Sequence, residues 1–280
     1  MQSSAKNKTN PSAKKPGAKK VVHPVTKPYL TGSAVDGTTV KSALMIFGGI
    51  AACAVLFLIV CSVMLFDSLA LRIVTNGLVM AVVLLIFYSS GISRGSVAVN
   101  QGEIMYHRRE TGMTIKDEEQ ARCYHPLKGF IIGLLGTLPF FLAALVLGLI
   151  AKRQMTGLGA LPSWVSGAET REEIALPLKY YHQGMALGLE GTLRLVVRLS
   201  IMPFVNMVGT ASPDNLLTLE RCSCLLELLP GIAYGFGYTR GVDVRTKVHT
   251  DIAAGKRKRA RKAKKEKERR RAPKGPTQLN

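Results

Sequence analysis

Three charged side chains stand in apolar stretches of this sequence, where charge is costly unless it has a partner. Arg194 and Arg198 lie in the stretch 192–209, and Glu227 lies in the stretch 222–238. Ionisable residues in membrane segments face the protein interior, pair with one another and mark ion or solute pathways. We therefore expect Arg194, Arg198 and Glu227 to form a site, with an ion pair between Arg198 and Glu227.

Two roles are open for these charges. In the first, the pair only holds two helices together, because polar contacts between membrane helices are common and contribute about 0.6 kcal/mol on average. In the second, the charges line a path for a proton or a solute. Residues four apart share a helix face, so Glu190, Arg194 and Arg198 are predicted to form one polar face in either case.

A larger concentration of charge lies near the C-terminus. The stretch 255–275 holds thirteen Lys and Arg against two Glu, in a chain whose formal net charge is +20. A segment of this charge density is typical of a tail that touches an anionic partner. The side chains expected to make that contact are Lys256, Arg257, Lys258, Arg259, Arg261, Lys262, Lys264, Lys265, Lys267, Arg269, Arg270 and Arg271.

Several partners are open for this basic stretch. Anionic lipid of the inner leaflet attracts such a segment with about 1 kcal/mol per basic residue near the surface. The phosphates of RNA, for example in a ribosome, would also bind it, with a strong salt dependence. Alternatively, the stretch is a solvated helix that only fixes the topology, because it is rich in helix formers. It has no aromatic residue for base stacking, so lipid or topology is favoured over RNA. Another membrane protein or a second copy of the chain is a further candidate.

No residue pattern indicates catalysis or a bound cofactor. Cys222 and Cys224 are separated by one residue, which is not the spacing of a common metal motif, and the five His residues are scattered. Neither a phosphate-binding glycine loop nor a serine-nucleophile motif occurs. We therefore predict no cofactor and no metal, and an enzyme is the weaker functional class.

Long apolar runs define the elements that must position the charged residues. About 20 apolar residues are enough for a helix to cross a bilayer, and five apolar segments occur in this chain of 280 residues. The sequence thus predicts an all-α polytopic membrane bundle with four spans. The spans are 42–66, 73–92, 128–151 and 222–238, and the segment 192–209 is a re-entrant, interfacial or additional span.

Charge at both ends determines the expected orientation. Cytoplasmic flanks of membrane spans carry an excess of Lys and Arg. Eight such residues lie between Lys6 and Lys41, and sixteen lie from Arg240 onward. Both termini are therefore predicted to be cytoplasmic, which requires an even number of spans. An Arg at mid-span costs about 2.5–3.5 kcal/mol, so 192–209 is taken as the segment that does not cross.

Two other topologies are open. Segment 192–209 could cross the membrane in place of 222–238, or both segments could cross. If both crossed, the basic tail would lie outside, against a membrane potential worth about 2.3 kcal/mol per elementary charge for each 100 mV. We therefore favour four spans.

The remaining regions are predicted from composition. Residues 1–41 have few large apolar side chains and are expected to be disordered. Residues 42–239 form the transmembrane domain, and residues 240–280 form a basic, partly helical cytoplasmic tail. A weak alternation in the stretch 96–107 predicts a small β-hairpin, and Trp164 is expected in an external interfacial loop.

Glycine spacing indicates how the helices approach one another. Glycines four residues apart permit close contact between helix backbones in membranes. Such pairs are Gly129 and Gly133, Gly184 and Gly188, and Gly231 and Gly235.

Two functions follow from these features. The first is a non-enzymatic membrane scaffold or accessory subunit whose basic tails bind lipid, a ribosome or a protein partner. The second is a small transporter or channel component whose path uses Arg198 and Glu227. A wet, charge-lined cavity within the membrane would favour transport, whereas a dry bundle packed through glycines would favour the scaffold.

Overall fold

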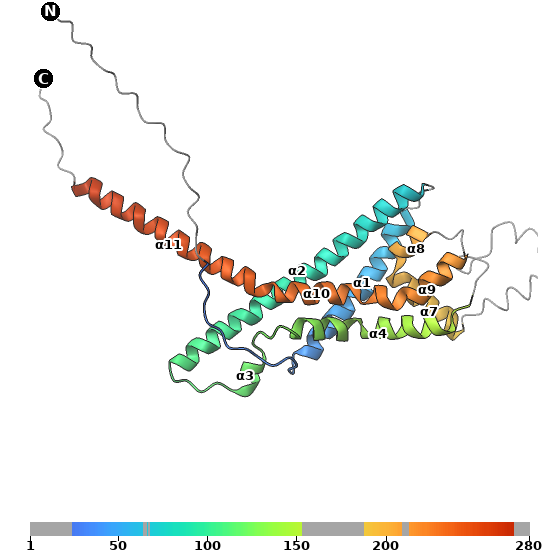
Figure 1. The fold of residues 1–280 in the computed structure, drawn as a ribbon, viewed down its shortest axis with the longest axis horizontal. Coiled ribbons are helices and arrows are strands. Elements are labelled where there is room, and N and C mark those ends of the chain that lie inside the picture. The colour runs from blue at the N-terminus through green and yellow to red at the C-terminus, as the bar shows by residue number, and fades with distance from the viewer. Residues whose placement is uncertain (1–23, 64–65, 67, 153–187, 209–212, 272–280) are drawn as a thin grey trace, which may run out of the picture. The chain divides into compact units, whose positions relative to one another are not determined.

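The computed structural model describes residues 24–63, 66, 68–152, 188–208 and 213–271. In these residues all regular elements are helices, so the predicted all-α fold is confirmed for this part of the chain (Figure 1). The helices are α1 (Thr39–Val63), α2 (Leu69–Glu110), α3 (Asp117–Ala121), α4 (Lys128–Ile150), α7 (Leu189–Ser200), α8 (Met202–Val208), α9 (Pro213–Glu227), α10 (Leu229–Thr239) and α11 (Gly241–Arg271).

The chain divides into two units. The larger unit is Lys27–Arg245, and the smaller unit includes residues 24–26 and 246–271. Within the smaller unit, the backbone N–H of Val25 donates to Thr250 Oγ1 at 3.0 Å. The predicted external loop with Trp164 lies outside the described residues.

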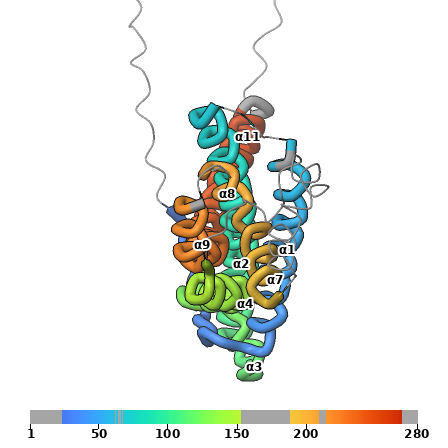
Figure 2. Tube along the Cα trace, turned by 90° about the vertical axis from the view of Figure 1, so that its right-hand side faces the viewer, coloured from blue at the N-terminus to red at the C-terminus, as the bar shows by residue number. Residues whose placement is uncertain are grey.

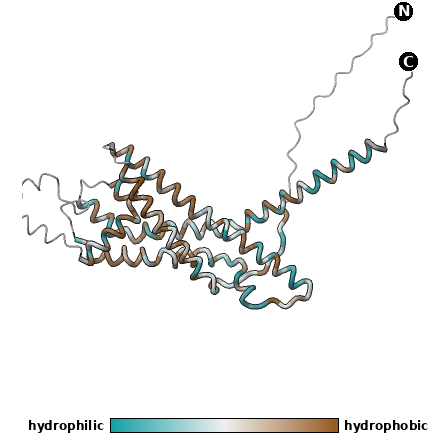
Figure 3. The backbone as a smooth tube through the Cα atoms, turned by 180° about the vertical axis from the view of Figure 1, so that it is seen from behind, coloured by the Kyte–Doolittle hydropathy of each residue, from teal (hydrophilic) through white to brown (hydrophobic). Residues whose placement is uncertain are grey.

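Three helices of the larger unit, α1, α2 and α4, are long and apolar enough to cross a membrane. Helices α7 and α8 reach that criterion only as a pair, and the chain bends by 92° between them. Figure 3 shows apolar residues along α1, α4 and the first half of α2, and polar residues toward the end of α2. The described residues therefore include three to four helices that fit a multi-pass membrane protein, and the fourth candidate is the pair of α7 and α8.

Helix α2 runs without a break from Leu69 to Glu110, so the β-hairpin predicted at 96–107 is wrong. Val97 and Val99 favour strands, but α2 packs against α10 at Gly91 and Gly95 and against the segment before α1 at Gly102. Its buried positions recur at the spacing of a helix face, and tertiary packing therefore overrides the local preference. The buried residues in this part of the helix are Gly91, Gly95, Ala98, Val99 and Gly102.

Helix α4 holds the larger unit together because it contacts α1, α7, α9 and α10. Figure 2 views it almost end-on, with α1, α7 and α9 beside it. From its start to its middle, at Ile132 and Phe140, it packs with buried side chains of α1 and α2. Its second half, at Ala144 and Leu147, packs with side chains of α7, α8 and α9. The two hydrophobic clusters thus share one helix.

Glycines bring the backbones of α4 and α10 into contact. A Cβ atom added at Gly231 would lie 2.7 Å from the carbonyl oxygen of Gly133, closer than real Cβ atoms approach. The same applies between α2 and α10, where a Cβ atom at Gly91 would lie 2.8 Å from the backbone nitrogen of Tyr238. The close approach predicted at Gly133 and Gly231 is therefore confirmed, and Gly184 lies outside the described residues.

The end of the bundle at the start of α4, called here the Lys128 end, is closed by the segment before α1. Lys128 Nζ donates to Asp36 Oδ2 at 2.8 Å, and both side chains are buried. Burial opposes the ionisation of Asp36, but hydrogen bonds from Lys128, Thr39 and Thr38 outweigh it and lower the pKa of Asp36. The negative charge is therefore kept, and the ion pair fixes the segment on the bundle.

Three tyrosines also pack together at the Lys128 end. The rings of Tyr124 and Tyr238 are stacked with centroids 5.5 Å apart, and Tyr29 meets Tyr124 edge-on at 6.0 Å. The backbone N–H of Leu30 also donates to the carbonyl of Gly102 at 3.1 Å. The part of the N-terminal region that the structure describes thus packs on the bundle, although composition alone suggested disorder for residues 1–41.

The segment predicted as one span at 222–238 is divided between two helices. Helix α9 ends at Glu227 and α10 begins at Leu229, with Pro230 in its first turn. Proline has no N–H to donate and is accommodated at a helix start, so it accounts for the break. Together the two helices follow α4, from Arg221 beside Gly148 to Tyr238 beside Gly129.

Helices α7 and α8 enter and leave at one end of the bundle, called here the Lys152 end. Arg194 Nη2 donates to the carbonyl of Lys152 at 2.8 Å near the start of α7. The last residue of α7, Ser200, lines a pocket with Ile50, halfway along α1. After the bend, Asn206 Nδ2 donates to the carbonyl of Cys61 at 3.1 Å, near the end of α1. The pair therefore reaches the middle of the bundle, where the chain bends by 92°.

The glycine contacts lead to a stability prediction. Substitution Gly231→Ala should lower the free energy of unfolding by about 1–3 kcal/mol, because the added methyl group overpacks the contact with α4. Gly48→Ala is the matched control, since a Cβ atom there meets nothing within 4 Å. The measurement is thermal unfolding of the detergent-solubilised protein. Equal melting temperatures for Gly231→Ala and the wild type would contradict the proposed role of this contact.

Candidate functional site

The predicted polar face of α7 is directed toward α9. Glu190, Arg194 and Arg198 lie one turn apart on α7, and Arg194 Nη1 lies 3.1 Å from Glu190 Oε1. The side chains of Arg194 and Arg198 are both buried, although the stretch 192–209 that contains them is mostly apolar. The spacing along the sequence therefore gave the correct face.

Both arginines donate hydrogen bonds to the carboxylate of Glu220 on α9, whose exposed fraction is only 1%. Arg194 Nε donates to Glu220 Oε1 at 2.9 Å, and Arg198 Nε donates to the same oxygen at 2.7 Å. Arg198 Nη2 forms a further contact with it. Hydrogen bonds between ionised groups are roughly twice as strong as neutral ones, so this cluster joins α7 to α9 at the Lys152 end.

Charges within the cluster are balanced. Two arginines face two carboxylates, Glu190 and Glu220, and the backbone N–H of Lys152 also donates to Glu190 Oε1 at 3.3 Å. A buried charge without a partner would cost several kcal/mol. Pairing therefore allows α7 to place two arginines inside the bundle.

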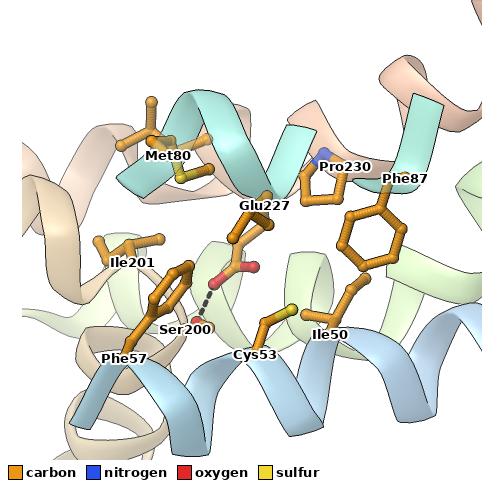
Figure 4. A pocket seen from close by; sticks show the side chains of 11 residues that line it. Ile50, Cys53, Phe57, Met80, Phe87, Ser200, Ile201, Glu227 and Pro230 are labelled. Carbon is orange, nitrogen blue, oxygen red and sulfur yellow. Dashed lines mark hydrogen bonds between the residues drawn. The ribbon is translucent and has the colours of Figure 1, made fainter. Parts of the chain in front are cut away.

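Glu227 lies elsewhere, in an apolar pocket between α1, α2, α7 and α10. A hydrogen bond joins Glu227 Oε1 to Ser200 Oγ, and the exposed fraction of Glu227 is 3%. Figure 4 shows the carboxyl group directed toward Ser200, with Cys53 on the facing helix. The cavity has room for about 10 Å³, the lower limit for a single water molecule. Its other lining residues are Ile50, Phe57, Met80, Val83, Phe87, Ile201, Leu226 and Pro230.

The structure thus separates the residues that the sequence grouped. It brings Arg194 and Arg198 together, but their printed carboxylate contacts are with Glu190 and Glu220, whereas Glu227 contacts Ser200. An Arg198–Glu227 pair stays a prediction without support from these contacts. Glu220 was missed because it precedes the apolar stretch 222–238. Its position, seven residues or two helical turns before Glu227, was the available signal.

The basic stretch lies on α11, which is helical through Arg271. Residues 256–268 are all exposed, and a helix that is polar all round has no apolar face to bury. The helix begins inside the larger unit, where Arg245 Nε donates to Glu103 Oε2 at 3.2 Å. A Cβ atom at Gly241 would meet the backbone at Ser96, 2.5 Å from its nitrogen. The first turn of α11 is therefore attached to α2.

Comparison of the chain with family models, with curated proteins and with solved structures finds no match. Among the described residues, no three His, Cys, Asp or Glu side chains come together as a metal site.

The charge cluster leads to a second prediction. Glu220→Ala should lower the free energy of unfolding by about 3–5 kcal/mol, because it leaves two buried guanidinium groups without their shared carboxylate. Asp243→Ala serves as the control, because the Arg240–Asp243 pair is 66% exposed on both sides and such an exposed pair contributes little to stability. Thermal and denaturant unfolding in detergent measures both.

Double-mutant cycles would identify the partner of Arg198. We expect the coupling free energy of Arg198→Ala with Glu220→Ala to exceed that with Glu227→Ala, because only Glu220 is bonded to the guanidinium in the contacts above. A larger coupling with Glu227 would favour the pair that the sequence suggested.

Proposed function

We propose that this chain is a non-enzymatic membrane scaffold or accessory subunit whose basic cytoplasmic tail contacts an anionic partner. The observation that carries the proposal is the close packing of the described helices. These helices meet through glycine backbones, and the pocket at the centre of the bundle has room for only about 10 Å³. A solute path would need a larger, wetted opening, whereas a platform for other molecules needs a firm bundle and an accessible tail.

The proposed topology has four spans and a re-entrant segment. Helices α1, α2 and α4 would cross, and α9 with α10 would form the fourth crossing, since together they follow α4 from Gly148 to Gly129. Helices α7 and α8 would form the re-entrant segment from the external side. An even number of spans then places both termini in the cytoplasm, in agreement with the basic flanks.

Anionic inner-leaflet lipid is the preferred partner of the tail. The nine basic residues between 256 and 267 are all exposed on α11 and lie all around the helix, so they present no single shaped face. The phosphates of anionic lipids would suit this arrangement, because they attract basic side chains by charge and do not require a particular shape. RNA of a ribosome and a protein partner, including a second copy of the chain, are the competing occupants.

A transporter or channel component is the second candidate. The polar stripe from Glu190 to Arg198 on α7, with Glu220 on α9, extends from the Lys152 end toward Glu227. Such a stripe could serve as half of a pathway. The charged side chains of this stripe are paired with one another, however, and this favours the scaffold function.

The topology predicts which sites are accessible from outside the cell. In a cysteine-free background, Ser163→Cys should react with a membrane-impermeant maleimide in intact cells, and Lys116→Cys should react only after permeabilisation. A reporter fused after Asn280 should be active only in the cytoplasm. A C-terminal reporter that is active only on the external side would refute the topology.

The tail predicts salt-sensitive binding that depends on charge count. Full-length protein in neutral-lipid nanodiscs should sediment with vesicles that contain phosphatidylserine. This binding should weaken steeply as the Debye length falls below about 8 Å. Replacing six of the twelve basic residues by Gln should weaken binding at least about a hundredfold, because each contributes about 1 kcal/mol.

A variant with residues 256–271 in scrambled order is the matched control and should bind as the wild type does. The same salt series with ribosomes or RNA separates the two anionic partners. If the scrambled variant fails to bind vesicles, the tail is recognised by its shape, and a specific protein partner replaces lipid.

A further inference from the structure

We propose that Glu227 is a proton-binding site inside the bundle, occupied in the arrangement described here, and that its proton holds the end of α7 against α9. The carboxyl group lies in an apolar pocket, and its hydrogen-bond partner among the described residues is Ser200. This inference goes beyond the scaffold function and does not depend on it.

The first argument counts hydrogens. Ser200 Oγ lies 2.8 Å from the carbonyl oxygen of Val197 and also forms the short contact with Glu227 Oε1. A serine hydroxyl has one hydrogen to donate, whereas a carbonyl and an ionised carboxylate only accept. Both contacts are satisfied when Glu227 carries a proton and donates to Ser200, and Ser200 donates to Val197. An ionised Glu227 would leave one contact without a hydrogen.

The second argument is the contrast with Glu220 on the same helix. Both carboxyl groups are almost fully buried, with exposed fractions of 1% and 3%. Glu220 receives donors from Arg194 and Arg198, whereas the lining of the Glu227 pocket contains no cationic side chain. An isolated ionised carboxylate in such a setting is so costly that the group takes up a proton instead.

The surrounding helices supply few other groups that titrate. Helix α1 contributes the Cys53 thiol to the pocket, while α2 and α10 contribute apolar side chains. The nearest cluster of charge on α7 and α9 consists of Arg198 and Glu220, and Glu220 lies two turns from Glu227, roughly 10 Å along the helix. The phenol of Tyr234, on α10, belongs to the same buried cluster as Ile50 and Phe87 of the pocket lining. The cavity is too small for a solute, which leaves a proton as the ligand.

Release of the proton would change the contact between α7 and α9. Breaking the O–H bond of Glu227 sends the proton to water at the pocket and leaves a carboxylate that can only accept. Ser200 must then turn its single hydrogen from Val197 to Glu227, and the buried negative charge favours entry of water. The stability of the bundle should therefore fall as the pH rises, since ionisation of a group that is neutral in the fold costs free energy.

Dicyclohexylcarbodiimide tests the protonation of both carboxyl groups in the full-length protein. A neutral carboxylic acid adds its O–H across one C=N bond, and the O-acylisourea rearranges to a stable N-acylurea with no atom lost. We expect one adduct, on the peptide that contains Glu227, which decreases as the pH rises and is absent in Glu227→Gln. Glu220 is the internal control and should stay unmodified. An adduct on Glu220 instead, or one whose yield does not depend on pH, would overturn the proposal.

Infrared difference spectroscopy needs no reagent to enter the pocket. The wild type should show a carbonyl band of a neutral carboxylic acid that Glu227→Gln lacks and that Ser200→Ala shifts. Glu227→Gln should keep the wild-type melting temperature and lose its decline at high pH, because a neutral amide replaces a neutral acid of similar size. If the wild type lacks this band at mildly acidic and neutral pH, Glu227 is ionised and the proposal fails. If Glu227→Gln does not fold, the band and its shift in Ser200→Ala decide the question.

Discussion

The contact between α4 and α10 is the constraint on which the rest of the bundle depends. Lipid chains are as apolar as leucine, so helices in a membrane gain little from burying apolar surface and are held by close packing. Gly133 and Gly231 remove the side chains that would keep the two backbones apart. Helix α10 then packs against α2, and α4 supports α1, α7 and α9. If α4 packed poorly at this position, its four neighbours α1, α7, α9 and α10 would lose the one helix that all of them contact.

The charged cluster solves a different problem, which is how to keep a short helix inside the bundle. Helix α7 has only twelve residues and ends at a 92° bend, so it is too short to span a membrane alone. Its arginines are tolerated because Glu190 and Glu220 balance their charge. Replacing such a cluster by apolar groups is often neutral for stability, which suggests that its main effect is to define where α7 lies.

The sequence predicted the parts of the structure whose signal is local. Apolar runs at 42–66 and 128–151 correspond closely to α1 and α4, because length and hydropathy alone determine whether a helix can span a bilayer. The continuation of α2 past residue 92 was missed, since the support for its second half comes from α10 and from the segment before α1. Glu220 was missed for the same reason. A partner on another helix cannot be recognised from spacing until the packing of the two helices is known.

Two carboxyl groups on one helix show how packing decides chemistry. Glu220 and Glu227 are the same residue type, two turns apart and almost equally buried. They differ in what α7 presents to each, because α7 offers two guanidinium groups at one level and a single hydroxyl at the other. Between Arg198 and Ser200, the side chains that α7 directs toward α9 thus change from charged to neutral polar. Since α7 ends at this point and the chain bends by 92°, the length of α7 sets how far these arginines enter the bundle.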